Sequence, residues 1–307
     1  MNEENNFESI YLLKKAEKLD PANFAYPYEI GIAYYLQDDY KKAVKYLKKA
    51  TQKDSCQAQC FLYLAKIQKQ NNEVNHSIET YKVGIEKLKN AGELYFQLGI
   101  AFQESNDIGS AIVTWKKGTI QAPNYASNYY ATSLYFCKHT TDRLTGVIDG
   151  ELFMNFERES EQTVEISQLL YATYKQSIIY NGKYSTINLT SKKRQAITTN
   201  PFPTLFKHTM DSILQKENSN EGFSIQSLHK LRTAFIVDWY QSNDNQQSTT
   251  VLFDWHKKLI ARNHFESYNY WLFRKANEKE FNEWYYYNKN KFDEFIEWFS
   301  LNPLIID

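Results

Sequence analysis

The sequence predicts an all-α protein, and three observations support that prediction. Its 307 residues include only 10 glycines and 6 prolines, and long stretches contain neither, which favours helices. Small and large residues recur with a fixed period of 34 residues in the first half of the chain. Helical hydrophobic patterns return in the second half, with one small candidate β-hairpin near residues 176–189.

The 34-residue period is clearest in a series of small residues at Gly31, Ala65, Gly99 and Ser133. Other positions repeat with the same spacing and keep their size class: Ile30, Leu64 and Leu98; Ala43, Ser77 and Ala111; Leu47, Tyr81 and Trp115; Ala50, Gly84 and Gly118. Pairs of helices explain this pattern, because small residues let two backbones approach and large residues fill the grooves between them. We therefore expect a half repeat at 7–23 and helix pairs at 24–57, 58–91 and 92–125, with polar turns at 37–39, 70–72 and 105–107.

A fourth unit begins at Ala126 but departs from the pattern. Its second helix, near Thr141–Phe156, has Gly146 and Gly150 where an alanine and a large residue are expected. A further helix over Ser160–Ser177 is interpreted as a degenerate continuation or a cap, which repeat arrays need to cover their last apolar face. The predicted domains are a repeat array at 1–177 and a C-terminal module at 178–307.

This pattern resembles the tetratricopeptide repeat (TPR) family, whose 34-residue unit carries W-x2-L-G-x2-Y, then A-x3-F-x2-A, then P. The third unit is the best match, with Tyr95, Leu98, Gly99, Phe102, Ala111, Trp115, Gly118 and Pro123. The resemblance covers about residues 7–140. It implies a right-handed helical superhelix that binds proteins or peptides, and it implies nothing direct about the rest of the chain.

The resemblance also implies where a partner would bind, because ligands of the family usually lie in the concave groove lined by the first helices. The matching positions are Tyr28, Ile32, Tyr35, Leu62, Lys66, Lys69, Phe96, Ile100, Gln103, Tyr130 and Leu134. One subgroup clamps the C-terminal carboxylate of chaperones with Lys, Asn and Arg, but the corresponding places here hold Tyr28, Ile32, Phe96 and Ile100, so such a clamp is not expected.

The predicted groove is apolar and aromatic, with Lys66 and Lys69 as its evident charges. A patch of this kind is normally covered in a soluble protein. Its occupant is either a peptide or helix of another protein, the chain's own C-terminal half, or a second copy of the chain. The sequence does not decide between these occupants, nor does it give the oligomeric state.

The second half is predicted to be an aromatic-rich helical module. Asn181-Gly182 predicts a hairpin turn, although the preceding helix could instead end at Gly182. A connection follows at Asn200–Pro203. Helices are expected at Thr204–Lys216, Ser224–Gln241, Thr249–Ala261, His264–Ala276 and Glu278–Phe299, with exposed loops at Glu217–Glu221 and Ser242–Ser248. Asn277, followed three residues later by Glu280, fits the start of a helix. Most of the tryptophans are expected to lie in the hydrophobic core.

Charge and cysteine content exclude several classes of function. Lys plus Arg and Asp plus Glu both number 36, so there is no net charge and nucleic acid is not expected as a partner; an RNA alternative would rest on the aromatics alone. The three cysteines form no disulfide framework, and Cys56 with Cys60 lacks further ligands for a metal. We expect no cofactor, no membrane span and no signal peptide, hence a cytoplasmic protein, or a periplasmic one if a leader has been removed.

Catalysis is the alternative from a different class. His264 with Glu266, or the nearby Asp254 and His256, could form a hydrolase-like site in the C-terminal module. No nucleophile motif, phosphate-binding loop or H-E-x-x-H motif accompanies them. The sequence therefore predicts a non-catalytic scaffold, with His264 at the start of a helix.

Overall fold

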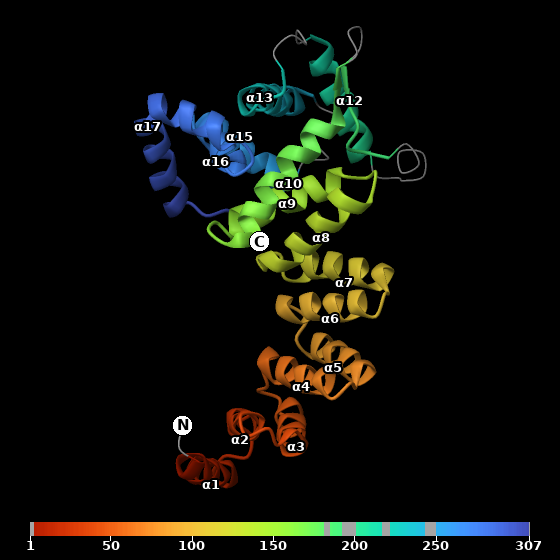
Figure 1. Cartoon of the computed structure of the whole chain (residues 1–307), viewed down its shortest axis with the longest axis vertical. Helices are drawn as coiled ribbons and strands as arrows, with labels where there is room; N and C mark the ends of the chain where they lie inside the picture. The colour runs from red at the N-terminus through yellow and green to blue at the C-terminus, as the bar shows by residue number, and fades with distance from the viewer. Residues whose placement is uncertain (1–2, 181–184, 192–200, 217–221, 243–249, 307) are drawn as a thin grey trace. The chain divides into compact units, whose positions relative to one another are not determined.

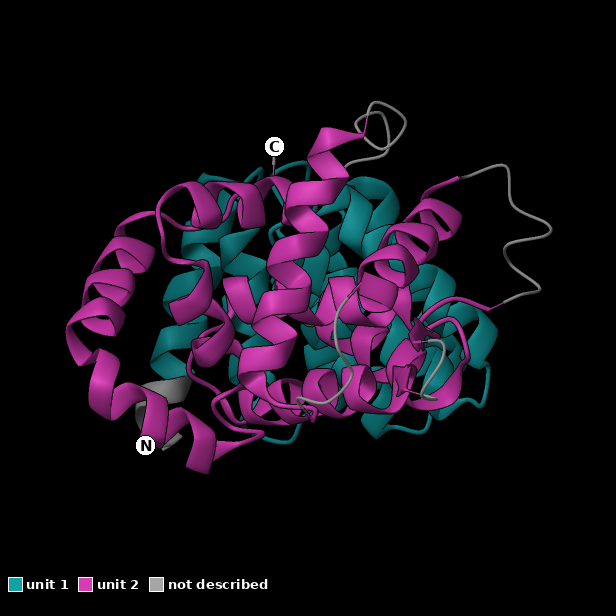
Figure 2. Cartoon of the chain, turned by 90° about the horizontal axis from the view of Figure 1, so that it is seen from above, with its two compact units in different colours: residues 1–128 teal, residues 129–307 magenta. Residues whose placement is uncertain are grey.

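The computed structural model describes residues 3–180, 185–191, 201–216, 222–242 and 250–306, without the side chains of 3–6. These residues form two compact units, 1–128 and 129–307 (Figure 2). Nearly all regular structure is helical (Figure 1), which confirms the predicted fold class. None of the helices in the described part of the chain is both long and apolar enough to cross a membrane.

Unit 1 is a stack of helix pairs that follows the 34-residue period (Figure 1). The first helix of each pair contacts the second, and successive pairs contact each other. Helix α1 is the half repeat and packs on α2. The helices are α1 (Glu3–Leu19), α2 (Ala25–Tyr35), α3 (Tyr40–Thr51), α4 (Ala58–Gln70), α5 (Val74–Lys87), α6 (Gly92–Glu104) and α7 (Ile108–Gln121).

The turn inside each pair repeats as strictly as the helices do. Asp38, Asn72 and Asn106 have φ values of 58°, 62° and 59°, in the left-handed region that Asn and Asp tolerate better than most residues. The next residue caps the second helix in two of the three pairs, where Asp39 accepts from the amide of Lys42 and Asp107 accepts from the amide of Ser110. One turn geometry therefore serves all three repeats.

Close helix packing explains why the repeat needs small residues. An added Cβ on Gly99 would lie 2.0 Å from the indole nitrogen of Trp115, which itself donates to the carbonyl of Phe96 at 3.1 Å. Only glycine leaves room for the indole, so the third pair is built around the contact between Gly99 and Trp115.

Unit 2 contains α8 (Ala126–His139), which begins in unit 1, and α9 (Leu144–Phe156). The glycines of α9 that break the repeat pattern lie against α8. An added Cβ on Gly150 would lie 2.4 Å from Oγ of Ser133, and one on Gly146 would lie 2.9 Å from the backbone nitrogen of Cys137. The departure from the pattern is therefore a close approach of the two helices.

The remaining elements of unit 2 are α10 (Glu161–Ser177), β1 (Ile178–Tyr180), β2 (Ser185–Ile187), α12 (Phe202–Lys216), α13 (Ile225–Gln241), α15 (Val251–Ala261), α16 (Phe265–Phe273) and α17 (Glu278–Leu301). Helix α16 contacts α10, α13, α15 and α17, so it lies at the centre of this unit. Trp239, Trp255 and Trp271 are buried, as expected of core residues. The predicted domain boundary at 177/178 stays a prediction.

The predicted hairpin is present, because Ile178 pairs with Ile187 and Tyr180 with Ser185 in an antiparallel register. Its turn, Asn181-Gly182, lies outside the described residues, as do the predicted loop at Glu217–Glu221 and residues 243–248 of the predicted loop at Ser242–Ser248. Asn277 does begin α17, and its side chain accepts from the amide of Glu280.

Candidate partner-binding groove

The first helices of the repeats, α2, α4 and α6, carry nine of the predicted groove residues. Helix α4 lies between the other two and contacts both. Six of the nine side chains are half-buried and three are exposed, so all remain at least partly accessible to a ligand. The half-buried ones are Tyr28, Ile32, Tyr35, Leu62, Phe96 and Ile100, and the exposed ones are Lys66, Lys69 and Gln103.

Aromatic rings join α2 to α4 in this surface. The ring of Tyr63 lies edge-on to those of Tyr28 and Tyr35, with centroids 6.0 and 6.2 Å away. The ammonium of Lys66 lies 5.2 Å from the ring centroid of Tyr35 and 5.6 Å from that of Tyr63, within the range of a cation–π contact. Tyr63 was not among the predicted groove residues.

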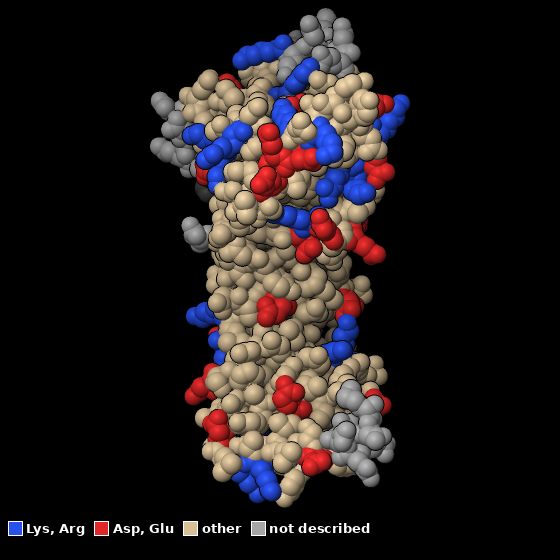
Figure 3. Space-filling view, turned by 90° about the vertical axis from the view of Figure 1, so that its left-hand side faces the viewer, with Lys and Arg blue, Asp and Glu red and all other residues tan. Residues whose placement is uncertain are grey.

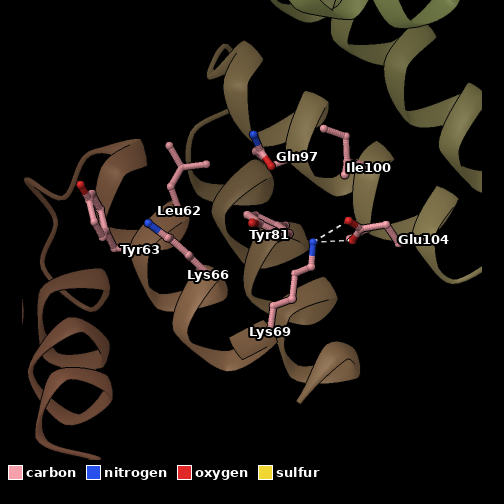
Figure 4. A pocket seen from close by; sticks show the side chains of 9 residues that line it. Leu62, Tyr63, Lys66, Lys69, Tyr81, Gln97, Ile100 and Glu104 are labelled. Carbon is pink, nitrogen blue, oxygen red and sulfur yellow. Dashed lines mark hydrogen bonds and ion pairs between the residues drawn. The ribbon is translucent and has the colours of Figure 1, made fainter. Parts of the chain in front are cut away.

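A cavity of about 260 Å³ opens between α4 and α6 (Figure 4). It is lined by Leu62, Tyr63, Lys66, Lys69, Tyr81, Gln97, Ile100, Ala101 and Glu104. Of the predicted groove residues, the cavity brings together Leu62, Lys66, Lys69 and Ile100. Tyr28, Ile32, Tyr35, Phe96 and Gln103 do not line it. Buried Tyr81 comes from α5, and burial raises the pKa of its hydroxyl to about 12, so it stays neutral.

The two lysines of the cavity differ in their partners. The ammonium of Lys69 lies 2.6 Å from the carboxylate of Glu104, as the dashed lines in Figure 4 mark. Within the described residues, no carboxylate lies within ion-pair distance of Lys66. Glu104 directly follows the predicted position Gln103 and neutralises one of the two charges that the sequence assigned to the groove.

The last two predicted groove residues, Tyr130 and Leu134, belong to unit 2. Within that unit the hydroxyl of Tyr130 donates to Glu165 at 2.6 Å, and its ring lies 5.3 Å from that of Phe153. Burial and the neighbouring carboxylate of Glu165 raise the pKa of Tyr130 to about 12. Leu134 is half-buried.

The four candidate catalytic residues make separate contacts. His256 bonds to Glu151 at 2.6 Å in the core, and Asp254 accepts from Tyr240 on the surface. The ring of His264, at the start of α16, lies 5.1 Å from that of Trp298. Glu266 accepts from the indole of Trp284 at 3.1 Å and pairs with Lys291. The cavity beside His256 measures about 20 Å³, which holds a single water and no substrate.

Unit 2 contains a buried charge network that was not predicted from the sequence. Glu151 of α9 pairs with Arg232 of α13 and with His256 of α15, and Arg232 also donates to Asn269 of α16. Burial alone would raise the pKa of Glu151, but the adjacent Arg232 and His256 outweigh it and lower this pKa to about 2. Burial lowers the pKa of His256, although the neighbouring carboxylate of Glu151 acts in the opposite direction. The network links four helices.

Cys56, Cys60 and Cys137 are buried free thiols. Burial raises the pKa values of Cys60 and Cys137 to about 11, so both stay protonated and unreactive. In the described part of the chain, no group of three or more His, Cys, Asp or Glu residues could hold a metal ion.

Figure 3 shows one face of the molecule, where acidic and basic side chains are interspersed.

No family model matches the chain, and no curated protein matches it in sequence. Two similar solved structures are described as "Crystal structure of MamA" and "Crystal structure of YrrB: a TPR protein with an unusual peptide-binding site". The first is 22% identical over 48% of this chain and 85% of that chain, with a TM-score of 0.38. The second is 18% identical over 52% of this chain and 81% of that chain, also with a TM-score of 0.38. The 34-residue period, the repeated turns and the paired helices give residues 7–125 the architecture of a TPR-type repeat array.

Proposed function

We propose that unit 1 is a non-catalytic protein-interaction scaffold that takes up a peptide or helix on the face formed by α2, α4 and α6. The cavity between α4 and α6 is the observation that supports this most strongly. Its lining combines apolar side chains, among them Leu62, Ile100 and Ala101, with a small number of polar groups. Sites that bind ligands through apolar contact and a few orienting polar groups have this composition.

The partly exposed apolar groups supply the driving force. Leu62 and Ile100 remain half-buried in the chain, so an apolar side chain of a partner would remove further surface from water. Each square ångström of apolar surface buried contributes about 25 cal/mol, and a well-seated aliphatic or aromatic side chain is worth about 1.5–3 kcal/mol. Tyr28, Tyr35 and Tyr63 extend this surface across α2 and α4 and provide rigid aromatic contacts.

The proposal is tested with the intact chain and a library of random 12-residue peptides displayed on phage. We expect selected peptides to lose at least tenfold in affinity when Ile100 is changed to Glu, because a charge would lie on the apolar lining. Val113→Glu is the matched control, since Val113 lies in α7, is 68% exposed and lines no part of the cavity.

Both variants are compared with the parent by circular dichroism and thermal unfolding before binding is measured. Equal binding by the parent, Ile100→Glu and Val113→Glu would place the interaction elsewhere on the chain. Peptides that bind the parent only after residues 178–307 are displaced, for instance by mild urea, would favour the alternative in which the chain's own C-terminal half covers the groove.

A further inference from the structure

The cavity between α4 and α6 has two ends of different electrostatic character. The ammonium of Lys66 points toward Tyr63, whereas that of Lys69 points toward Glu104 (Figure 4). The protein therefore balances the charge of Lys69 itself. The ammonium of Lys66 contacts the side chain of Tyr35 and the ring of Tyr63, which are neutral groups. Its charge is therefore not balanced by a carboxylate of the described residues, and the ammonium can still donate to a ligand.

Gln97 of α6 adds a neutral hydrogen-bonding group on the side of the cavity opposite Lys66. Its side chain is half-buried, and its amide forms no hydrogen bond with the residues that the structure describes. A side-chain amide offers both donors and an acceptor, which matches the amide and carbonyl of an extended peptide backbone. The lining also includes the apolar side chains of Leu62 from α4 and of Ile100 and Ala101 from α6.

We propose that this cavity selects a peptide segment in which an acidic side chain is adjacent to a bulky apolar side chain. The carboxylate pairs with Lys66, the apolar side chain packs on Leu62 and Ile100, and the backbone bonds to Gln97. Because Lys69 is already paired with Glu104, the far end of the cavity offers no available ammonium to a carboxylate, and this difference between the two ends fixes the orientation of the segment. This inference rests on the proposed function and names the class of partner.

A carboxylate fits this site better than a phosphate does. Phosphorylated peptides are usually held by clusters of arginines that bind several phosphate oxygens together. The cavity contains no arginine, and its second lysine is already paired with Glu104. A single ammonium without a carboxylate partner among the described residues, beside an apolar surface, suits one Asp or Glu side chain.

The test uses the peptides selected on the intact chain, resynthesised with a fluorescent label and measured by fluorescence anisotropy. We expect them to share an Asp or Glu next to a bulky apolar residue. Changing that acid to its amide should weaken binding to the parent about tenfold, as expected for the loss of one charge-assisted hydrogen bond. Lys66→Gln should weaken the binding of the acidic peptide to the same extent. It should also remove the difference in affinity between the acidic peptide and its amide form. Lys48→Gln is the matched control, because Lys48 is exposed and lies outside the cavity. It should leave the affinities for the acidic and the amide peptide as they are in the parent.

The outcomes separate the inference from the proposed function. If Ile100→Glu abolishes binding but Lys66→Gln binds acid and amide peptides as the parent does, the groove is the binding site and the acidic preference is wrong. If neither substitution changes binding, both proposals are wrong. Failure to select any peptide on the folded chain contradicts both as well.

Discussion

The carboxylate of Glu104 lies 2.6 Å from the ammonium of Lys69, and this ion pair joins α6 to α4 at one end of the cavity. Both side chains are 47% exposed, so the pair contributes only about 0–1 kcal/mol to the free energy of unfolding. Its larger effect is on charge, because it leaves Lys66 as the cation of the cavity without a carboxylate partner among the described residues. The ion pair thus determines which end of the cavity attracts an acid.

Replacing Glu104 by Gln should release Lys69 and give the cavity a second available ammonium. We expect peptides with two acidic residues to bind several-fold more tightly, and their affinity to fall more steeply with salt than it does in the parent. Anisotropy titrations at low and high ionic strength measure this. Glu79→Gln is the control, because it breaks the exposed ion pair with Lys82 in α5. It should change neither the affinity for these peptides nor its dependence on salt. Weaker binding of acidic peptides by Glu104→Gln would contradict the assigned charges.

Gly99→Ala should destabilise unit 1, because the added methyl group would lie 2.0 Å from the indole of Trp115. Overpacking of this kind costs about 1–3 kcal/mol in the free energy of unfolding. Gly109→Ala in α7 is the control, since the nearest atom to its added Cβ is 3.7 Å away. There the same change should not destabilise the helix. Urea unfolding followed by circular dichroism compares the two, and a Gly99→Ala variant as stable as the parent would refute the packing account.

Glu151→Gln should destabilise unit 2 strongly, because it leaves the guanidinium of Arg232 buried without a counter-charge. Breaking a buried pair in this way costs about 3–5 kcal/mol, whereas replacing both partners with apolar residues is often close to neutral. The double variant Glu151→Leu, Arg232→Met should therefore be more stable than Glu151→Gln alone. Exposed Glu161→Gln serves as the control. If the double variant loses as much stability as both single changes added together, the charges are not the source of the effect.

Acid should destabilise the protein from about pH 6.5 downward. Burial lowers the pKa of His229 from 6.5 to about 4 and also lowers that of His256. Between about pH 6.5 and pH 4, His229 of the unfolded chain binds a proton that the folded chain does not bind. The free energy of unfolding therefore falls as the pH falls. Glu151, whose pKa is lowered from 4.5 to about 2, adds a further loss in that lower range. Urea unfolding at stepped pH measures the slope.

His229→Gln removes one of the groups behind this slope. We expect its unfolding free energy to depend less on pH than that of the parent between pH 6.5 and 4. The difference between the two proteins at pH 7 reports the loss of packing and of the hydrogen bond with Thr233, and it serves as the internal reference. An unchanged slope would mean that His229 has the same pKa in the folded and the unfolded chain, contrary to the lowering by burial.

The repeat array could be predicted from sequence because its determinants are local and periodic. The glycine and alanine positions fix the helix pairs, and the polar runs fix the turns, so Asp38, Asn72 and Asn106 share one backbone conformation. The lining of the cavity could be predicted only in part. Leu62, Lys66, Lys69 and Ile100 were found, but Gln97 and Glu104 were not, because the carried-over positions do not specify which neighbouring side chain on the same helix turns into the cavity.

The buried network of unit 2 could not be predicted, because nothing local joins its members. Arg232 is 81 residues from Glu151, and His256 is 105 residues from it. The available signal was Glu151 itself, a charge directly before the apolar run Leu152, Phe153 and Met154. Such a residue must be paired in a folded core, but the sequence does not say with which partner.

Site-specific photo-crosslinking from position 103 tests the central claim most directly. Gln103 is exposed, directly precedes Glu104 in α6 and does not line the cavity, so a photoreactive phenylalanine derivative at this position leaves the lining unchanged. The same derivative at exposed Val113 is the control. The account predicts a crosslink from position 103 to a selected peptide with an acidic and an apolar residue, and none from position 113. Crosslinks from position 103 only to residues 178–307 of the same chain, or equal peptide crosslinking from both positions, would contradict it.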